Sequence, residues 1–221
     1  MYQLLIFDWD GTIMDSSQRI VSSMQYAAQQ LDLPIPDAQA VRNIIGLSLA
    51  NANKILIPNI TDADNSRLTA AYSHHYRDLN QVETPLYQGV RQTLEQLHGK
   101  GYRLAVATGK SRKGVDRVLE ETGLGELFHY SRGADETKSK PDPLMLSELI
   151  AQADVALERA IMIGDTSYDL QMAQNIGMSS IGVSYGMHSV ELLNSFNPVK
   201  IVDQFKQIED WLDKQSKSIS E

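Results

Sequence analysis

The sequence predicts an α/β protein, a doubly wound parallel sheet that carries a small all-helical insertion, and three observations lead to this fold class. From Gly89 onward, strand-like and helix-like segments alternate, which is typical of a parallel sheet with helices on both faces. About 90 residues separate the first apolar segment, LLIF, from the next one near Tyr102, far more than the one helix that joins two parallel strands. The residues of that interval show helical spacing throughout.

The first part of the chain holds one strand and the inserted helices. LLIF, residues 4–7, is expected to be the first buried strand. The helical segments that follow are SSMQYAAQQLDL, AQAVRNIIGLSLANANKIL and ADNSRLTAAYSHHYRDLN, with prolines at the expected breaks, Pro34, Pro36, Pro58 and Pro85. We therefore expect a Rossmann-like core formed by residues 1–15 and 86–221, and a helical cap formed by residues 16–85.

The second part of the chain alternates between helix and strand. The expected helices are GVRQTLEQLHGKG, RKGVDRVLEETGLG, DPLMLSELIAQADV, YDLQMAQNIG and IVDQFKQIEDWLDKQ. The expected strands are YRLAVATG, LFHYSRG, AIMIGD and MSSIGVS. Gly101, Gly123 and Gly177 follow helical patterns, where a residue with left-handed backbone commonly closes a helix. The polar tail KSISE, residues 217–221, is expected to fray.

Composition and charge exclude several classes of function. The 221 residues carry 20 Lys and Arg against 28 Asp and Glu, with no basic run, so nucleic acid is not an expected partner. The absence of cysteine excludes disulfides, thiolate zinc sites and thiol nucleophiles. No apolar segment approaches the ~20 residues that cross a bilayer, so no membrane association is predicted. Only a short apolar run precedes Asp8, which is unlike a secretory signal, so we expect a cytoplasmic protein; the sequence predicts no oligomeric state.

Two aspartates, Asp8 and Asp10, follow the first strand within FDWDGT. Side chains two residues apart in a strand point to the same side, so these carboxylates would face one space if the strand continues. Like charges this close repel, and a partly buried pair resists ionisation unless a cation lies between its members. Ligands of open α/β sheets bind beyond the carboxyl ends of the strands, where the inserted helices would cover them. The pair therefore predicts a cation-binding active site at this edge of the sheet.

Polar side chains also follow the later strands. Thr108 and Gly109 come after LAVA, Lys140 follows the loop that precedes a helix, and Asp165 and Asp169 come after IMIG. Carboxylates with a hydroxyl and a lysine suit an oxygen-coordinated Mg²⁺ next to a phosphoryl group. A small phosphorylated molecule is therefore the predicted type of substrate.

Four motifs, FDWDGT, VATG, KSKPDP and GDTSYD, occur in an order that resembles the haloacid dehalogenase superfamily of phosphotransferases. The resemblance extends from Leu4 to about Val183, and the helical insertion has the position of that family's cap. The sequence is most similar to the phosphoglycolate phosphatase-like branch, whose small helical cap lies between the first and second motifs. The resemblance implies a Mg²⁺-dependent phosphoric monoester hydrolase that forms an aspartyl-phosphate intermediate.

The resemblance also implies a role for each matched acidic residue. Asp8 would attack phosphorus, and Asp10 would protonate the leaving alkoxide and then deprotonate water. Mg²⁺ would be held by the Asp8 carboxylate, the main-chain carbonyl of Asp10 and Asp165, while Asp169 would orient these ligands. The cation would neutralise the carboxylates so that an anionic nucleophile can approach an anionic substrate.

The same resemblance implies that Thr108, the backbone amide of Gly109 and Lys140 bind the phosphoryl oxygens. Lys140 is preferred over Lys138 because the family's lysine directly precedes proline. Gly109 departs from the family pattern, since many relatives carry Asn there, and only its amide is left to donate. In the cap, Arg42 and the neighbouring IIGLSL resemble the family's substrate-facing loop, so Arg42 is a candidate for substrate specificity.

Other functions remain open or can be argued against. A phosphomutase of the sugar-phosphate type fits the same motifs, and a catalytically silent binding module is a weaker alternative because it would not need all these groups. Dehalogenases lack the second aspartate and phosphonatases have a small residue there, whereas this chain has Asp10. Signalling receivers place their acceptor aspartate on a later strand and lack a cap. The five histidines are scattered or, at His74 and His75, adjacent on different helix faces, and are interpreted as structural.

Overall fold

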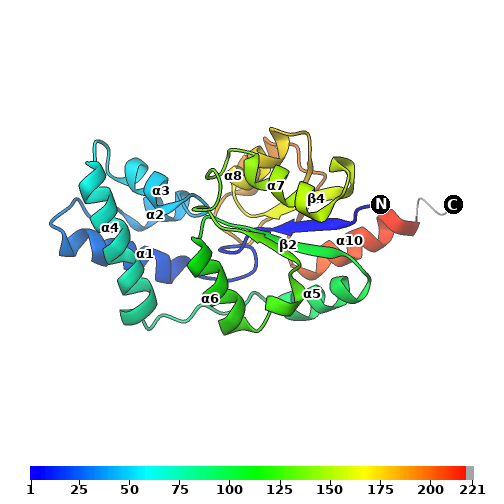
Figure 1. Ribbon diagram of the computed structural model, residues 1–221, viewed down its shortest axis with the longest axis horizontal. Coiled ribbons are helices and arrows are strands. Elements are labelled where there is room, and N and C mark those ends of the chain that lie inside the picture. The colour runs from blue at the N-terminus through cyan, green and yellow to red at the C-terminus, as the bar shows by residue number, and fades with distance from the viewer. Residues whose placement is uncertain (218–221) are drawn as a thin grey trace.

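The computed structural model of the chain describes residues 1–217, and most of the tail that we expect to fray, residues 218–221, lies outside them. Six parallel strands form one sheet in the order β3-β2-β1-β4-β5-β6. The strands are β1 (Leu4–Phe7), β2 (Arg103–Ala107), β3 (Tyr130–Arg132), β4 (Ala160–Gly164), β5 (Ser179–Val183) and β6 (Lys200–Val202). The predicted doubly wound parallel sheet is confirmed (Figure 1).

Helices cover both faces of this sheet. Side chains alternate along β1, so that Leu5 and Phe7 join one buried cluster while Leu4 and Ile6 join another. The first cluster includes residues of α5 (Val90–Gly99), α6 (Arg112–Thr122) and α10 (Lys206–Lys217), and the second includes residues of α7 (Leu144–Ala153) and α8 (Ser167–Gln174). Two 3₁₀ turns, η2 (Gly125–Leu127) and η3 (Leu157–Arg159), and the short α9 (Val190–Asn194) complete this part of the chain.

The segment between β1 and β2 is helical. It contains α1 (Ser17–Gln30), α2 (Ala38–Asn43), α3 (Leu49–Leu56), α4 (Asp62–His74) and the π-helical turn η1 (His75–Leu79). These helices bury a hydrophobic cluster of their own, which includes Met24, Val41 and Leu68. Figure 1 shows them together at the end of the molecule toward which β1 runs.

The structure corrects two element boundaries expected from the sequence. The segment expected to be helical over residues 38–56 is two helices, because the chain turns between α2 and α3, where Gly46 has a φ of +103° that glycine adopts without strain. The last expected helix starts late, because β6 first pairs with β5 and buries Val202 before α10 begins at Lys206.

The ends of several helices follow the signals in the sequence. Gly101, Gly123 and Gly177 have φ values of +85°, +63° and +71°, the left-handed conformation expected after a helix. Pro34 lies between α1 and α2, and Pro58 lies between α3 and α4. In the part of the chain that the structure describes, no helix is both long and apolar enough to cross a membrane.

Two segments of the chain connect the sheet to the inserted helices, and they are hydrogen-bonded to each other. The amide of Asp15 donates to the carbonyl of Pro85 at 2.9 Å, and the amide of Tyr87 donates to the carbonyl of Ile13 at 3.0 Å. We call this pair of segments, residues 13–15 and 85–87, the stem. It joins the inserted helices to the edge of the sheet at which the strands end.

Candidate active site

Polar side chains from separate elements meet where the strands end. Asp8 follows β1, Thr108 follows β2 and Asp165 follows β4, and these strands are neighbours in the sheet. Lys140 comes from the loop before α7, and Asp169 comes from the first turn of α8. All five residues are at most 1% exposed. We call Asp8, Lys140, Asp165 and Asp169 the aspartate cluster.

The carboxylate of Asp8 is held through one of its oxygens. Oδ1 accepts a hydrogen bond from the amide of Trp9 at 2.7 Å and lies 2.8 Å from Nζ of Lys140. Oδ2 is buried and has no hydrogen-bond partner among residues 1–217. Burial, followed by the charge of Asp169, raises the pKa of Asp8 well above its ordinary value, and Lys140 opposes this only in part. A buried carboxylate with one unpartnered oxygen can accept a cation or act as a nucleophile.

Lys140 is a buried cation between two carboxylates. Its Nζ lies 2.6 Å from Oδ1 of Asp169 and 2.8 Å from Oδ1 of Asp8. Burial alone would lower the pKa of this ammonium, but Asp169 and Asp8 outweigh burial and raise it, so Lys140 is charged at neutral pH. Lys138, the other lysine of the third motif, is exposed and lies 3.4 Å from Asp142. The structure thus places Lys140, and not Lys138, against Asp8.

The two aspartates after β4 are fixed by hydrogen bonds. Asp165 accepts from the Thr12 hydroxyl at 2.8 Å and from the Met187 amide at 2.9 Å, and burial is the main cause that raises its pKa to about 7. Asp169 accepts from the amide and hydroxyl of Thr166 at 3.1 and 2.7 Å, in a capping box at the start of α8. Each aspartate therefore has a set orientation before any ligand arrives.

The aspartate cluster fits a divalent cation bound by oxygen. Asp8, Asp165 and Asp169 each offer a carboxylate oxygen, and these oxygens all lie within 4.8 Å of one another in a fully buried space. One lysine cannot neutralise three carboxylates, and the unpartnered Oδ2 of Asp8 is available to a further cation. Carboxylate oxygens are the ligands that Mg²⁺ prefers in proteins.

Asp10 lies outside the aspartate cluster and has different partners. The hydroxyl of Ser16 donates to its Oδ1, and Nζ of Lys110 lies 2.9 Å from the same oxygen. Burial opposes the charge of Lys110, but Asp10 outweighs burial and the pKa of this ammonium is raised. Lys110 was missed by the reasoning from sequence. The available signal was its place two residues after Thr108, at the end of the same strand.

The inserted helices contact the aspartate-cluster side of the sheet through Asn43. The hydroxyl of Tyr168 donates to the carbonyl of Asn43 at 2.9 Å. His188 accepts from the Ser167 amide through Nδ1 at 2.9 Å, so the neutral ring carries its proton on Nε2, which is directed to the same carbonyl at 3.3 Å. Burial lowers the pKa of His188, which favours this neutral form. His188 therefore links the start of α8 to the inserted helices through these hydrogen bonds.

The turn between α2 and α3 packs directly against Gly109. A Cβ atom built on Gly109 would lie 2.5 Å from the carbonyl oxygen of Leu47 and 2.6 Å from that of Gly46, and both of these are backbone atoms that cannot rotate away. The amide of Ser48 also donates to the hydroxyl of Ser139 at 2.9 Å. A side chain at this position, asparagine included, could not coexist with the turn in its present place.

Arg42, the predicted specificity residue, lies near these contacts without making one of them. It is the residue before Asn43 in α2 and is half-buried. Among residues 1–217 its guanidinium forms no hydrogen bond or ion pair. The structure therefore places Arg42 beside the turn but does not join it to the aspartate cluster.

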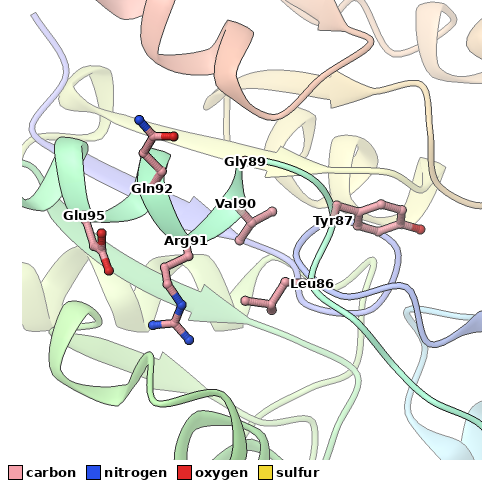
Figure 2. A pocket seen from close by; sticks show the side chains of 7 residues that line it. All are labelled: Leu86, Tyr87, Gly89, Val90, Arg91, Gln92 and Glu95. Atoms are coloured by element: carbon pink, nitrogen blue, oxygen red, sulfur yellow. The ribbon is translucent and has the colours of Figure 1, made fainter.

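A groove of about 330 Å³ lies at the start of α5, apart from these residues (Figure 2). It is lined by Leu86, Tyr87, Gly89, Val90, Arg91, Gln92 and Glu95. Figure 2 shows that these side chains come from the stem and the first turns of α5. The lining includes no member of the aspartate cluster, so the groove is not part of the candidate site.

Comparisons with known proteins agree with this geometry. Residues 5–183 match the family model described as haloacid dehalogenase-like hydrolase. The chain is 38% identical over 217 residues to the probable phosphatase IndB of Dickeya dadantii, covering 94% of this chain and 92% of that protein. It is 30% identical over 214 residues to a phosphoglycolate phosphatase of Aliivibrio fischeri, covering 93% and 94%. A solved structure of a predicted phosphatase from Clostridium acetobutylicum is similar with a TM-score of 0.87 and 25% identity, covering 97% of this chain and 99% of that one.

Proposed function

The chain belongs to the haloacid dehalogenase-like hydrolase family, as a phosphoric monoester hydrolase, and we propose that it is a Mg²⁺-dependent phosphatase acting through an aspartyl-phosphate. The proposed substrate is a small phosphorylated metabolite, in keeping with relatives named phosphoglycolate phosphatase. The observation that carries the proposal is Asp8, a buried carboxylate with one oxygen held by Lys140 and the other unpartnered among the described residues.

In this proposal Asp8 and Asp10 divide the chemistry. An oxygen of Asp8 forms a bond to phosphorus while the ester P–O bond breaks, and Asp10 gives its proton to the departing alkoxide oxygen. Water then attacks the phosphoryl group, Asp10 takes up a proton from that water, and the P–O bond to Asp8 breaks. Inorganic phosphate leaves, and both aspartates return to their starting states.

Mg²⁺ would be held by the Asp8 carboxylate, the main-chain carbonyl of Asp10 and Asp165. When bound it would supply positive charge that offsets the carboxylates and the phosphoryl group. Asp169 would orient the ligands of this site, because both of its oxygens already accept hydrogen bonds, from Lys140 and Thr166.

The phosphoryl oxygens would be bound by the Thr108 hydroxyl, the Gly109 amide and the Lys140 ammonium. Thr108 and Gly109 follow β2, and Asp8 follows the neighbouring strand β1, so these residues lie at the same edge of the sheet. Donors fixed before the reaction stabilise charge that develops on the phosphoryl group without the cost of reorganisation.

We assign residues 1–15 and 86–221 to the catalytic core and residues 16–85 to a cap. The cap would open and close about the stem, with hinges near residues 15–17 and 84–88, to admit substrate and exclude water. Substrate preference would then depend on cap residues, Arg42 among them. The cytoplasmic location predicted from the sequence stays a prediction.

The direct test is phosphate release from a panel of esters with the purified chain. The panel should contain 2-phosphoglycolate, glycerol phosphates, sugar phosphates and p-nitrophenyl phosphate, with Asp8→Asn as the matched control. Stoichiometric inorganic phosphate from at least one ester, abolished in the control, supports a phosphatase. Isomerisation of a sugar phosphate without stoichiometric phosphate would instead assign a mutase, and no turnover of any ester would overturn the proposal.

The metal assignment has its own test. Activity should be lost in excess chelator and restored by Mg²⁺. Ca²⁺ should inhibit, because it takes more ligands at longer distances and would engage both oxygens of Asp8, leaving none free to attack. Full turnover after removal of divalent ions, or in Ca²⁺ alone, would contradict the assignment.

A further inference from the structure

Lys110 is a largely buried cation that the mechanism above does not use. Its side chain is 11% exposed, and its Nζ lies 2.9 Å from Oδ1 of Asp10, whose side chain is 10% exposed. The hydroxyl of Ser16 donates to the same oxygen. No hydrogen bond reaches Oδ2 of Asp10 from the residues that the structure describes. One oxygen of Asp10 is therefore fixed by two partners, and the other is left open.

Tyr76, a residue of the inserted helices, has its ring close to the ammonium of Lys110. Nζ of Lys110 lies 5.2 Å from the centre of the Tyr76 ring, close enough for a cation–π interaction. Arg19 and Arg117 also lie over this ring, at 4.9 and 5.3 Å, and Nε of Arg19 donates to the carbonyl of Tyr76 at 2.9 Å. Tyr76 is buried and stands in the π-helical turn η1, a type of turn that often occurs at functional positions.

The order of contacts therefore runs from the cap to the proposed acid–base residue. Tyr76 lies in η1, whereas Lys110 lies in the loop between β2 and α6, so their contact exists only while cap and core are together. Lys110 in turn holds Asp10. A carboxylate that exchanges protons with a substrate oxygen must present one oxygen at hydrogen-bond distance, and small misplacements reduce the rate strongly.

We propose that Lys110 is a positioning residue for Asp10: by holding Oδ1, it directs Oδ2 of Asp10 to the leaving-group oxygen. Tyr76 holds the ammonium of Lys110 in this place when the cap is docked. The inference rests on the proposed phosphatase function. In the first step the proton moves from Oδ2 of Asp10 to the departing oxygen as the ester P–O bond breaks, and in the second step Oδ2 takes a proton from the attacking water. Lys110 keeps its own protons in both steps.

The chain's lack of cysteine allows a test that separates the charge of Lys110 from its volume. Lys110→Cys introduces one thiol, and alkylation with 2-bromoethylamine restores an ammonium at nearly the length of lysine. Alkylation with iodoacetamide instead gives a neutral side chain of similar size. The readout is kcat on two esters, p-nitrophenyl phosphate and the alkyl ester that the wild-type chain turns over fastest.

The two esters differ in their need for the acid. An alkoxide leaves poorly without a proton, whereas p-nitrophenolate leaves with little help, so a misplaced acid should affect the alkyl ester more. General acid–base catalysis contributes roughly 10²- to 10⁴-fold, and we expect Lys110→Cys to lose on the order of 30-fold more on the alkyl ester. The aminoethylated variant should recover most of this ratio, and the carboxamidomethylated variant should not.

Lys113→Cys is the matched control, because Lys113 is exposed on α6 three residues away and is treated in the same way. It should keep the wild-type ratio before and after alkylation. Thermal melting of each variant checks that the fold is retained.

The contribution of Tyr76 is tested from the cap. Tyr76→Leu removes the ring and should lower the alkyl-to-aryl ratio of kcat by roughly threefold to tenfold, the size expected of a partly desolvated cation–π contact, whereas Tyr76→Phe should keep it. Tyr26→Leu is the matched control, since Tyr26 stacks on His75 at 4.0 Å within the same group of helices and, among the described residues, no lysine or arginine lies over its ring.

The outcomes separate this inference from the function on which it rests. If the wild-type chain releases phosphate from neither ester, both are overturned. If the wild type is active but Lys110→Cys loses activity equally on both esters, or if the neutral alkylation restores the ratio as well as the charged one, the positioning role is overturned alone. A selective loss that only the ammonium reverses establishes it.

Discussion

Asp8 and Asp10 lie two residues apart, yet they belong to regions built in different ways. Asp8 is held in the aspartate cluster, whose members all come from the ends of core strands and the elements that follow them. Asp10 is held at the boundary with the inserted helices, by Ser16 just before α1 and by Lys110 beneath Tyr76. The first environment is formed without the inserted helices, whereas the second includes a residue of theirs, Tyr76.

This difference suggests why one strand end can serve two steps. The nucleophile needs a fixed position relative to phosphorus, and a buried cluster with set hydrogen bonds supplies it before substrate arrives. In the proposed mechanism the acid, Asp10, acts when the leaving group is enclosed, and its contacts on the side of the inserted helices agree with that order. The predictions below test the two environments, beginning with the nucleophile.

The largest effect is expected from the two aspartates themselves. Asp8→Asn should be inactive on every substrate, because no other group can form the intermediate. Asp10→Asn should retain attack on p-nitrophenyl phosphate but slow the hydrolysis of the intermediate, since it lacks a base for water. It should release a burst of p-nitrophenol near one equivalent per site and accumulate a phosphorylated protein detectable by intact mass.

The prediction also requires that the phosphoryl group be on Asp8. Hydroxylamine should remove it, and peptide mapping should place it on Asp8. If p-nitrophenol and inorganic phosphate appear in step in Asp10→Asn, with no adduct after quenching, the division of roles between the two aspartates is wrong.

The next largest effect should come from breaking the aspartate cluster. Lys140→Met leaves Asp8 and Asp169 without their buried cation, and loss of one partner of such a group costs about 3–5 kcal/mol. The free energy of unfolding in urea should fall by about that amount in chelator, with a smaller fall in Mg²⁺, which would replace part of the missing charge. Lys138→Met, at an exposed position, is the control and should change stability by less than about 0.5 kcal/mol.

In the metal-free chain, the free energy of unfolding should depend on pH because of the same aspartate cluster. The pKa of Asp165 is raised from 3.8 to about 7, so the folded chain keeps a proton in this range that the unfolded chain releases. The free energy of unfolding should therefore decrease as the pH rises from about 4 to about 7. Urea unfolding in chelator at about pH 5 and about pH 8 measures this decrease, and Mg²⁺ or Asp165→Asn should reduce it. If neither Mg²⁺ nor Asp165→Asn changes the pH dependence of the free energy of unfolding, the pKa of Asp165 is the same in the folded and the unfolded chain.

A smaller effect is expected where the cap meets the core. Gly109→Ala places a Cβ against two backbone carbonyls, so the turn between α2 and α3 should move away and the docked cap should be disfavoured. We expect kcat/KM on the best metabolite to fall by up to about 100-fold, the size that a misplacement of roughly 1 Å can cost. Gly99→Ala, where a Cβ meets nothing within 4 Å, is the control. Wild-type kinetics in Gly109→Ala would mean that the turn is not packed this way in the active enzyme.

The sequence predicted the sheet and the polar residues at its strand ends because both follow from local patterns. The strands β1, β2 and β4 are short apolar runs, and Asp8, Thr108 and Asp165 each follow one of them, so parallel order brings these three residues to one edge. Lys140 was identified from its motif, and the structure gives the physical reason, a buried position between two carboxylates.

The contacts between the inserted helices and the rest of the chain could not be predicted in the same way. Lys110 and Tyr76 lie 34 positions apart and meet only because the inserted helices are placed against the loop that follows β2, which no local periodicity specifies. The turn at Gly46 was hidden because the apolar spacing on its two sides looks like one helix. The reason for a glycine at position 109 can be seen only once the carbonyl of Leu47 is known to lie against it.

The smallest effect is expected at Arg42, and it tests whether the cap side also selects the substrate. Its guanidinium has no partner among the described residues, so Arg42→Ala should leave stability within about 0.5 kcal/mol of the wild type. If the guanidinium meets a substrate group, kcat/KM should fall severalfold on anionic metabolites and hardly at all on p-nitrophenyl phosphate, because one exposed charge contact is worth about 1 kcal/mol. Lys54→Ala, at an exposed cap position paired with Asp62 at 3.5 Å, controls for the loss of a positive charge. Equal rates on all esters would remove Arg42 from the substrate site and leave the turn and Tyr76 as the cap's contribution, because those segments, unlike Arg42, already touch the core.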